Sequence, residues 1–195
     1  MSATSLLGVA AVTFVGTNID NLAVTAAQFA AAPAHRLRRL TAGQLTGFLV
    51  ILGASAGGAA ILSALPVRWV GLLGLVPLAL GLRGLLALRR PAEARDPRWP
   101  VAGGFFTAAL VTVGSGGDNL AVTIAVLRQG DPGHGAFVAV CLVALDLLAT
   151  GGAFLLGRHP RTLRLVERGT VVLTPLARCA IGVFVLARAG TFAGL

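Results

Sequence analysis

The sequence predicts an all-α, polytopic membrane protein with six transmembrane helices, arranged as two inverted three-helix repeats. Three observations lead to this prediction. Hydrophobic residues make up 56% of the 195 residues and charged residues only 12%, which is about half the charge of a soluble domain. The apolar residues fall in six runs, each long enough to cross a bilayer. A polar motif also recurs at an offset of 98 residues.

Six apolar runs, joined by short connections, account for most of the chain. A membrane helix needs about 20 residues, and each run supplies that length. The expected spans are residues 5–31, 42–65, 69–88, 101–127, 136–156 and 170–189. We therefore expect one membrane domain over residues 1–195, with repeat one at about 1–90, a cytoplasmic connection at about 89–100 and repeat two at about 99–189.

The arginine distribution predicts the orientation of these spans. The net charge of +9 comes from 16 basic residues, all arginine, against 7 acidic ones. The first, third and fifth connections carry three, four and four arginines, but the second and fourth carry one each. Because cytoplasmic connections are the more positive ones, both termini are expected on the outer side of a bacterial inner membrane. This placement fits a lipid bilayer as partner better than a nucleic acid.

The sequence lacks the motifs of an enzyme. Cys141 and Cys179 lie within apolar runs and form no Cys-x-x-Cys pair, and a membrane thiol-disulfide enzyme would need cysteines where the repeated motif has aspartates. A nucleotide-binding loop needs a lysine, which the chain does not have. No His-Glu-x-x-His or nucleophile motif of a hydrolase occurs. We expect a protein that is no enzyme and holds no cofactor.

Glycines four residues apart occur twice in the second run. Gly43 and Gly47 form one pair, and Gly53 and Gly57 form the other. Each pair places small residues on one helix face, which predicts close helix packing in the membrane.

The repeated motif lies in the first and fourth runs. Residues 16–25 read GTNIDNLAVT and align with residues 114–123, GSGGDNLAVT, so that six consecutive positions are identical. Each half of the chain has three expected spans, an odd number, and the second half must therefore enter the membrane from the opposite side. Such inverted repeats are typical of secondary transporters, whose sites lie near the membrane midplane.

Polar side chains form a stripe on one face of both motif helices. An aspartate near the centre of a span costs about 2.5 to 3.5 kcal/mol, so each stripe needs an interaction that offsets this cost. Gly116 and Gly117 weaken the second helix and free backbone groups, which membranes tolerate only inside protein or beside a wet cavity. The stripes predict a site for a cation or a polar substrate; the alternative is that the aspartates only cap restarted helices. The stripe residues are Thr13, Thr17, Asp20, Asn21, Thr25 and Gln28 in the first run, and Thr112, Ser115, Asp118, Asn119 and Thr123 in the fourth.

Three more polar residues stand inside apolar runs. Asp146 lies in the fifth run and Arg178 in the sixth. The two could form an ion pair between helices, or Asp146 could act as a third ligand or a proton carrier. Gln44 in the second run is either a donor into the site or a hydrogen-bonding group between helices.

Four motifs together resemble a known family. They are Gly-Thr-x-x-Asp at residues 16–20, Gly43-Gln44, the stretch GLLGLVPLALG at residues 71–81 and Gly-x-Asp-Asn at residues 116–119. The chain resembles the cadmium-resistance transporters of the CadD type, in the LysE superfamily of small exporters, over nearly its whole length. The resemblance implies a six-helix inner-membrane exporter that lowers cytoplasmic cadmium or a similar divalent metal.

We therefore expect a secondary transporter that exports a divalent metal cation as its substrate. Asp20 and Asp118 are the expected metal ligands. Proton exchange is the expected coupling, since export of a dication opposes the interior-negative potential. Carboxylate, amide and hydroxyl ligands suit harder ions such as Mn²⁺, Mg²⁺ or Ca²⁺. The other expected site residues are Asn21, Asn119, Asn18, Thr17, Ser115, Asp146 and Gln44.

An alternative function is export of an amino acid or a similar small zwitterion. In that case half-helix ends would hold the carboxylate, and one of the two motif aspartates would hold the amine. The sequence leaves open whether the chain forms a homo-oligomer.

Overall fold

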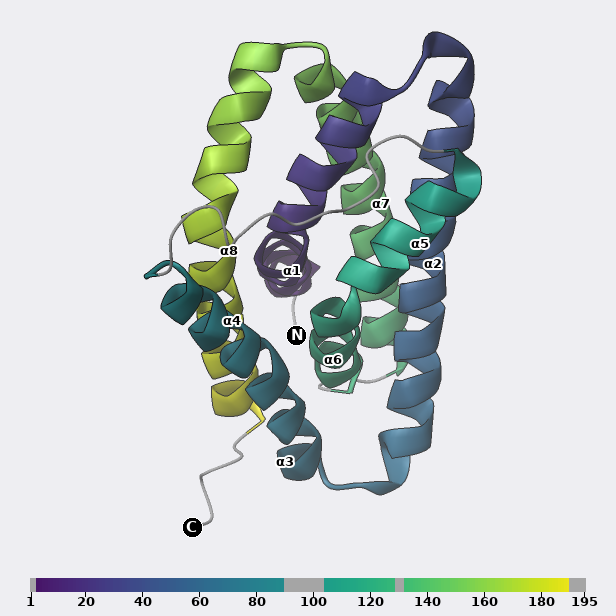
Figure 1. Cartoon of the computed structure of the whole chain (residues 1–195). Coiled ribbons are helices and arrows are strands. Elements are labelled where there is room, and N and C mark those ends of the chain that lie inside the picture. Colours follow the sequence, from purple (N-terminus) through teal and green to yellow (C-terminus); the bar gives the residue numbers. More distant parts are fainter. Residues whose placement is uncertain (1–2, 90–103, 129–131, 190–195) are drawn as a thin grey trace.

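The computed structural model describes residues 3–89, 104–128 and 132–189, and every regular element in these ranges is a helix (Figure 1). The prediction of an all-α fold is therefore confirmed for the described residues. The side chain of Asp118 lies outside the described part, as do residues 90–100 of the expected cytoplasmic connection. The elements are α1 (Ala3–Ala31), η1 (Ala34–Arg36), α2 (Leu37–Ile61), η2 (Leu62–Ala64), α3 (Val67–Val70), η3 (Gly71–Gly74), α4 (Leu75–Ala87), α5 (Phe105–Ser115), α6 (Gly117–Leu127), α7 (Pro132–Gly157) and α8 (Pro160–Arg188).

Four of the described helices are long and apolar enough to cross a membrane by themselves. They correspond to α1, α2, α7 and α8. The bent pair of α5 and α6 makes a fifth span if it is counted as one, and the apolar stretch Gly71–Ala87 is shorter. Large apolar side chains cover the outside of the bundle; Leu110, Val140 and Leu148 are each about 70% exposed. A multi-pass membrane protein exposes such side chains to lipid rather than to water.

The fourth expected span is broken where the glycine pair stands. α5 ends at Ser115, Gly116 has φ −90° and ψ 14°, and α6 begins at Gly117. The two helices meet at a bend of 67°, which confirms the expected weakness of the helix at Gly116 and Gly117. α1, in contrast, continues unbroken through Asp20, so Asp20 does not cap a restarted helix.

The fifth connection is shorter than expected. The arginine-rich segment 157–169 is predicted as a connection, but α8 begins at Pro160 and its apolar window begins only at Arg168. Proline favours the first position of a helix, because the backbone N–H that it lacks would have no partner within the helix there and its fixed φ is already helical. Pro160 therefore favours this early start. The arginines of this segment therefore lie mostly on the first turns of a helix that extends beyond its apolar part.

Helices of the two halves pack against each other in a cross-paired manner. α1 packs most extensively on α7, α2 on α5 and α6, and α4 on α8. Successive glycines along α2 face successive residues along α5 and α6: Gly43 faces Phe105, Gly47 faces Thr112 and Gly58 faces Ile124. α2 therefore runs parallel to α5 and α6.

The α4–α8 pair has the opposite relative direction. In this pair Gly74 faces Gly182, Gly81 faces Cys179 and Gly84 faces Pro175. The numbers rise on one helix as they fall on the other, so these two helices are antiparallel, and Figure 1 shows them side by side.

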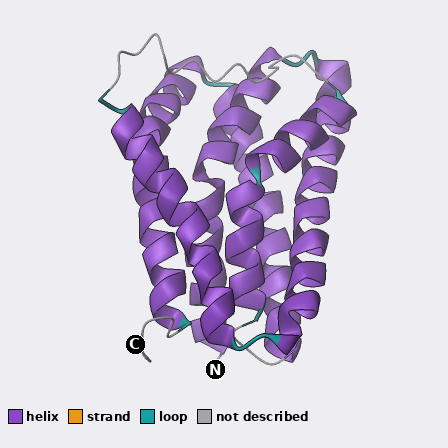
Figure 2. Ribbon diagram, turned by 60° about the horizontal axis from the view of Figure 1, so that its bottom comes forward, coloured by secondary structure: helices purple, strands orange, loops and turns teal. Residues whose placement is uncertain are grey.

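Chain connections gather at the two ends of the bundle. Arg128, after α6, donates to the carbonyl oxygens of Ser63 (3.2 Å) and Leu65 (3.0 Å), so the α2–α3 and α6–α7 connections share one end. At the other end Gly157 of α7 packs on the backbone of Ala26 in α1. The start of α1 and the end of α8 lie at the same end of the bundle (Figure 2).

Candidate functional site

The polar stripes of both motif helices face the inside of the bundle. Eight of their eleven members are buried to between 1% and 6% exposure. Ser115 is half-buried, the Asp20 side chain is 27% exposed, and the side chain of Asp118 is not described. Burial of so many polar groups among apolar helices is unfavourable unless they find partners. The described buried members of the stripes are Thr13, Thr17, Asn21, Thr25, Gln28, Thr112, Asn119 and Thr123.

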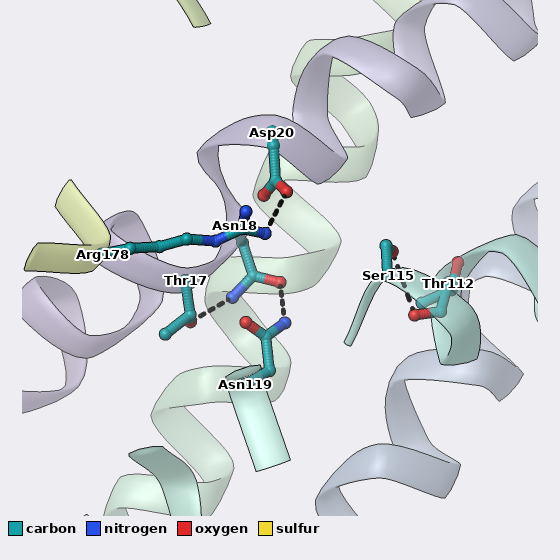
Figure 3. A network of polar contacts seen from close by, with 7 residues as sticks. All are labelled: Thr17, Asn18, Asp20, Thr112, Ser115, Asn119 and Arg178. Atoms are coloured by element: carbon teal, nitrogen blue, oxygen red, sulfur yellow. Dashed lines mark hydrogen bonds and ion pairs between the residues drawn. The ribbon is translucent and has the colours of Figure 1, made fainter. Parts of the chain in front are cut away.

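An amide chain connects the two halves of the molecule. Asn119 of α6 donates from Nδ2 to Asn18 Oδ1 of α1 at 3.0 Å. Asn18 in turn donates to Thr17 Oγ1 at 2.9 Å (Figure 3). The Thr17 hydroxyl donates to the carbonyl of Thr13 at 2.9 Å. Each donor thus fixes the next acceptor, which holds α6 against α1 at the level of the motif.

Asp20 forms an ion pair with Arg178. The Arg178 Nη2 to Asp20 Oδ2 distance is 2.7 Å, and the two side chains are 21% and 27% exposed (Figure 3). Arg178 is therefore paired with Asp20, and the alternative of an Asp146–Arg178 pair does not describe this structure, because no ion pair joins Asp146 to a described residue. Since consecutive residues on a helix differ by 100°, Asp20 faces α8 while Asn21 faces α7.

Gln44 and Thr112 join α2 to α5. Thr112 Oγ1 donates a short hydrogen bond to Gln44 Oε1, and both residues are at most 2% exposed. Ser115 Oγ donates to the carbonyl of Thr112 at 3.2 Å, within its own helix. Gln44 therefore serves helix packing through its oxygen and also lines a cavity. The two interpretations of Gln44 are compatible.

Asp146 lies at 2% exposure in α7, against a small cavity between α1, α2 and α7. The space open to the centre of a water molecule inside it is about 10 Å³, which is room for about one water. Among the described residues, Asp146 Oδ2 and Asn21 Oδ1 have no hydrogen-bond partner. We call this space the Asp146 cavity; its lining is Phe14, Asn18, Asn21, Leu22, Thr25, Gln44, Asp146, Ala149, Thr150 and Ala153.

Two buried acceptor oxygens in the lining of one cavity, Asp146 Oδ2 and Asn21 Oδ1, need a hydrogen-bond donor or a cation. A carboxylate is costly to bury alone, and a buried amide oxygen also loses its hydration. The cavity's polar lining is made of carboxylate, amide and hydroxyl groups. Oxygen donors of this kind bind hard or borderline divalent cations.

No dense metal cluster accompanies this cavity. Within the described residues, no three His, Cys, Asp or Glu side chains lie close enough to hold a metal ion together. The two described cysteines do not line it. The arrangement offers one charged ligand and several neutral ones, which is a weaker set than a structural metal site has.

The structure brings together only some of the predicted site residues. Asn18, Asn21, Gln44 and Asp146 line one cavity, and Asn18 contacts Asn119. Thr17 supports that contact, Ser115 bonds within its own helix, Asp20 faces Arg178, and the side chain of Asp118 is not described.

One polar residue of the lining, Thr150, was not predicted from the sequence. Thr150 is 7% exposed and lines the cavity. It lies four residues after Asp146, and therefore on the same helix face. This spacing was the available signal, but a single threonine in an apolar run is common in membrane helices.

Comparison with known proteins gives one match. A family model described as cadmium resistance transporter matches residues 14–195. No curated protein and no solved structure matches the chain. The matched range includes the motif segment of α1, the bend between α5 and α6, and every residue that lines the Asp146 cavity.

Proposed function

The chain belongs to the cadmium resistance transporter family, and we propose that it is a secondary transporter that exports a divalent metal cation, cadmium or a similar ion, from the cytoplasm. The family is one of transporters and not of enzymes. Metal efflux across a lipid bilayer is therefore the setting in which the polar interior has to be understood.

The observation that carries this proposal is the acid at the Asp146 cavity. Asp146 is 2% exposed, and its Oδ2 has no donor among the described residues. An ionisable side chain inside a membrane protein normally faces a partner, a substrate pathway or a proton relay. A cation that enters and leaves supplies the missing partner for part of the transport cycle.

The size of the cavity favours a metal ion over a zwitterion. About 10 Å³ is open to water centres, which accommodates one water-sized particle. An amino acid is several times larger than a water molecule, and even its ammonium group alone would fill this space. The Asp146 cavity therefore supports a small cation as the substrate in this conformation.

The proposed transporter has six spans in two inverted repeats. The offset of 98 residues places α1 on α5 and α6, α2 on α7, and α3 to α4 on α8. The contacts have the same symmetry, because the α1–α7 pair corresponds to the pair of α2 with α5 and α6. A twofold axis in the membrane plane reverses direction, as observed for the antiparallel α4 and α8.

In this proposal, Asp20 and Asp118 are the acids that the ion meets before or after the Asp146 cavity. Support comes from the cation that Asp20 already holds, the guanidinium of Arg178 at 2.7 Å. A metal ion can exchange with that guanidinium if the helices move apart by a small amount. Thr17, Ser115 and the Asn119–Asn18 contact then position the two motif segments around the passing ion.

Proton exchange is the proposed source of energy. Moving a dication outward, against an interior-negative potential, costs about 2.3 kcal/mol per charge for every 100 mV. A carboxylate that binds either a proton or the metal ion links the two flows, and Asp146 is the buried candidate. No hydrolysed cofactor is needed under this scheme.

The proposal is tested in inside-out vesicles that contain a metal-sensing dye. An imposed pH gradient, acidic inside, is expected to drive Mn²⁺ or Cd²⁺ into vesicles that carry the protein. The Asp20→Asn, Asp118→Asn double variant is expected to lose at least about 90% of this uptake, since neither motif acid can then attract the ion. Normal uptake by the double variant would contradict the roles given to the two acids.

A binding screen separates the metal from the zwitterion. Purified protein is expected to gain thermal stability with Mn²⁺ or Cd²⁺ and not with lysine or arginine as ligands. Stabilisation by the amino acids alone would overturn the choice of substrate class. Vesicles without the protein, and vesicles without the pH gradient, are the controls for leakage and for coupling.

A further inference from the structure

The Asp146 cavity has a counterpart at the equivalent place in the other repeat. A second small cavity lies between α1, α2, α6 and α7, again with about 10 Å³ open to water centres. We call it the Phe48 cavity; it is lined by Thr17, Asn18, Phe48, Ile51, Leu52, Asn119, Thr123 and Leu142. Six of these residues lie at an offset of 98 from residues of the Asp146 cavity.

Two pairs of equivalent residues keep their polar character. Asn21 corresponds to Asn119, and Thr25 corresponds to Thr123. All four side chains are buried to between 2% and 6% exposure. The motif therefore gives each cavity the same amide and the same hydroxyl.

Three other pairs of equivalent residues differ in chemistry: the polar member of each pair lines the Asp146 cavity, and the apolar member lines the Phe48 cavity. Where the Asp146 cavity has Asp146, Gln44 and Thr150, the Phe48 cavity has Phe48, Leu142 and Leu52 at the corresponding positions. An aromatic ring and two leucines supply no oxygen ligand for a divalent cation, so nothing in these three positions would replace the water that the ion loses. The Phe48 cavity thus keeps the shape of an ion site without its acid.

Open ligand atoms follow the same division. Asp146 and Asn21 both line the Asp146 cavity, and the Oδ2 of Asp146 and the Oδ1 of Asn21 have no donor among the described residues. In the Phe48 cavity Asn119 also has an oxygen with no described donor, but its Nδ2 is used to hold Asn18. A neutral amide oxygen alone does not offset the dehydration of a dication, whereas a carboxylate beside it can.

We propose that the Asp146 cavity holds one largely dehydrated divalent cation and that the Phe48 cavity holds none, so each chain binds a single ion. This inference rests on the proposed export function and names the site and its stoichiometry. Asp146 supplies the charge, Asn21 supplies an amide oxygen that has no described donor, and Thr25 and Thr150 supply hydroxyl groups in the same lining. The side-chain oxygens of Asn18 and Gln44 already accept hydrogen bonds from Asn119 and Thr112.

The experiment measures Mn²⁺ binding to purified protein by calorimetry and by thermal stability. The wild type is expected to bind one Mn²⁺ per chain. Asp146→Asn, which keeps the shape and removes the charge, is expected to weaken binding at least about tenfold. Without metal, Asp146→Asn is expected to melt no lower than the wild type, because it removes an unpaired buried acid.

A repeat-matched pair of variants tests the asymmetry itself. Thr25→Val and Thr123→Val make the same change at equivalent positions, both buried. Thr25→Val is expected to weaken Mn²⁺ binding about threefold to tenfold, and Thr123→Val to leave it within about twofold. Equal effects of the two variants, or two ions bound per chain, would overturn the proposal.

The outcomes separate this inference from the proposed function. If the wild type transports Mn²⁺ and Asp146→Asn transports it equally well, export stands and the Asp146 cavity is not its site. If one Mn²⁺ binds and Asp146→Asn abolishes binding, but vesicles show no uptake, the site stands and the export function fails. Loss of binding in Asp146→Asn together with a lower melting temperature without metal would contradict the ligand role and indicate a structural one.

Discussion

Asn18 is the residue at which the two halves of the site meet. It lines both cavities, accepts the Asn119 amide at 3.0 Å and donates to Thr17 Oγ1 at 2.9 Å. The repeat places Gly116, the residue between α5 and α6, at the equivalent position. An amide side chain on one side and a glycine bend on the other therefore occupy matching positions, and this difference is part of the asymmetry between the cavities.

The Asp20–Arg178 pair gives a prediction at the residue scale. Arg178→Gln is expected to lower the free energy of unfolding by about 1 to 3 kcal/mol, between the values for exposed and for fully buried pairs, since both side chains are partly exposed. Asp20→Asn should lower it similarly. The double variant should lose less free energy of unfolding than the two single variants lose together. Once one partner is gone, the second substitution no longer breaks an ion pair.

Thermal melting in detergent measures these four proteins side by side. Arg83→Gln serves as the control, because Arg83 is exposed and has no ion pair among the described residues; its change should stay within about 0.5 kcal/mol. Additive losses from Asp20→Asn and Arg178→Gln would show that the contact contributes no coupling energy.

At this scale the sequence indicates which residues are polar but not which ones meet. Asp20 and Asp146 are both intramembrane acids, and either could have paired with Arg178. Periodicity gives the face of a helix on which a residue lies, but the neighbour of that face depends on how helices pack. Only the packing of α1 between α7 and α8 directs Asp20 toward Arg178 and leaves Asp146 beside Asn21.

At the scale of elements, the two glycine pairs of α2 have different roles. A Cβ on Gly47 would lie 2.7 Å from Thr112 Cβ and 2.8 Å from the carbonyl oxygen of Ala109, and Gly43 packs even more tightly on α5. Gly53 and Gly57 would meet nothing within 4 Å among the described residues. Close packing is therefore confirmed for the first pair, and the second pair lacks a described neighbour.

Gly47→Ala and Gly53→Ala test this difference with the same change on one helix. Gly47→Ala is expected to destabilise the protein by about 1 to 3 kcal/mol, because α5 must move away from α2. Gly53→Ala is expected to be neutral or to stabilise by up to about 1 kcal/mol, through higher helix propensity. Melting temperatures in the same detergent check both values. Similar losses in the two variants would mean that a surface of Gly53 is covered in the membrane.

The elements themselves could largely be predicted from the sequence. Apolar length predicts where the helices lie, although only four of them, or five with the bent pair of α5 and α6, are long enough to count as candidate spans, and Gly116-Gly117 predicts the break. The start of α8 at Pro160 could not be predicted, because a segment rich in charged residues has the composition of a connection. In the structure this segment forms the first turns of α8, ahead of its apolar part. The lining of the cavities also depends on three helices at once, which no single run reveals.

For the whole molecule, the arrangement of connections sets a topology that can be tested. Arg128 ties the α6–α7 connection to Ser63 and Leu65 after α2, and the α1–α2 and α7–α8 connections lie at the opposite end. Most arginines of the described connections are at that second end, from Arg36 to Arg39 and from Arg158 to Arg168. The positive-inside rule predicts that this end is cytoplasmic and that both termini are outside.

Cysteine labelling in intact cells tests this orientation. In a background with Cys141→Ala and Cys179→Ala, single cysteines at Ser63, His35 and Arg161 probe exposed positions at the two ends. A maleimide that does not cross membranes is expected to label Ser63→Cys in intact cells, and His35→Cys and Arg161→Cys only after permeabilisation. Because His35 and Arg161 belong to different repeats, labelling of one but not the other in intact cells would contradict the inverted repeat itself. Labelling of both would keep the repeat and reverse its orientation, and the Asp146 cavity would then load its ion from the opposite side.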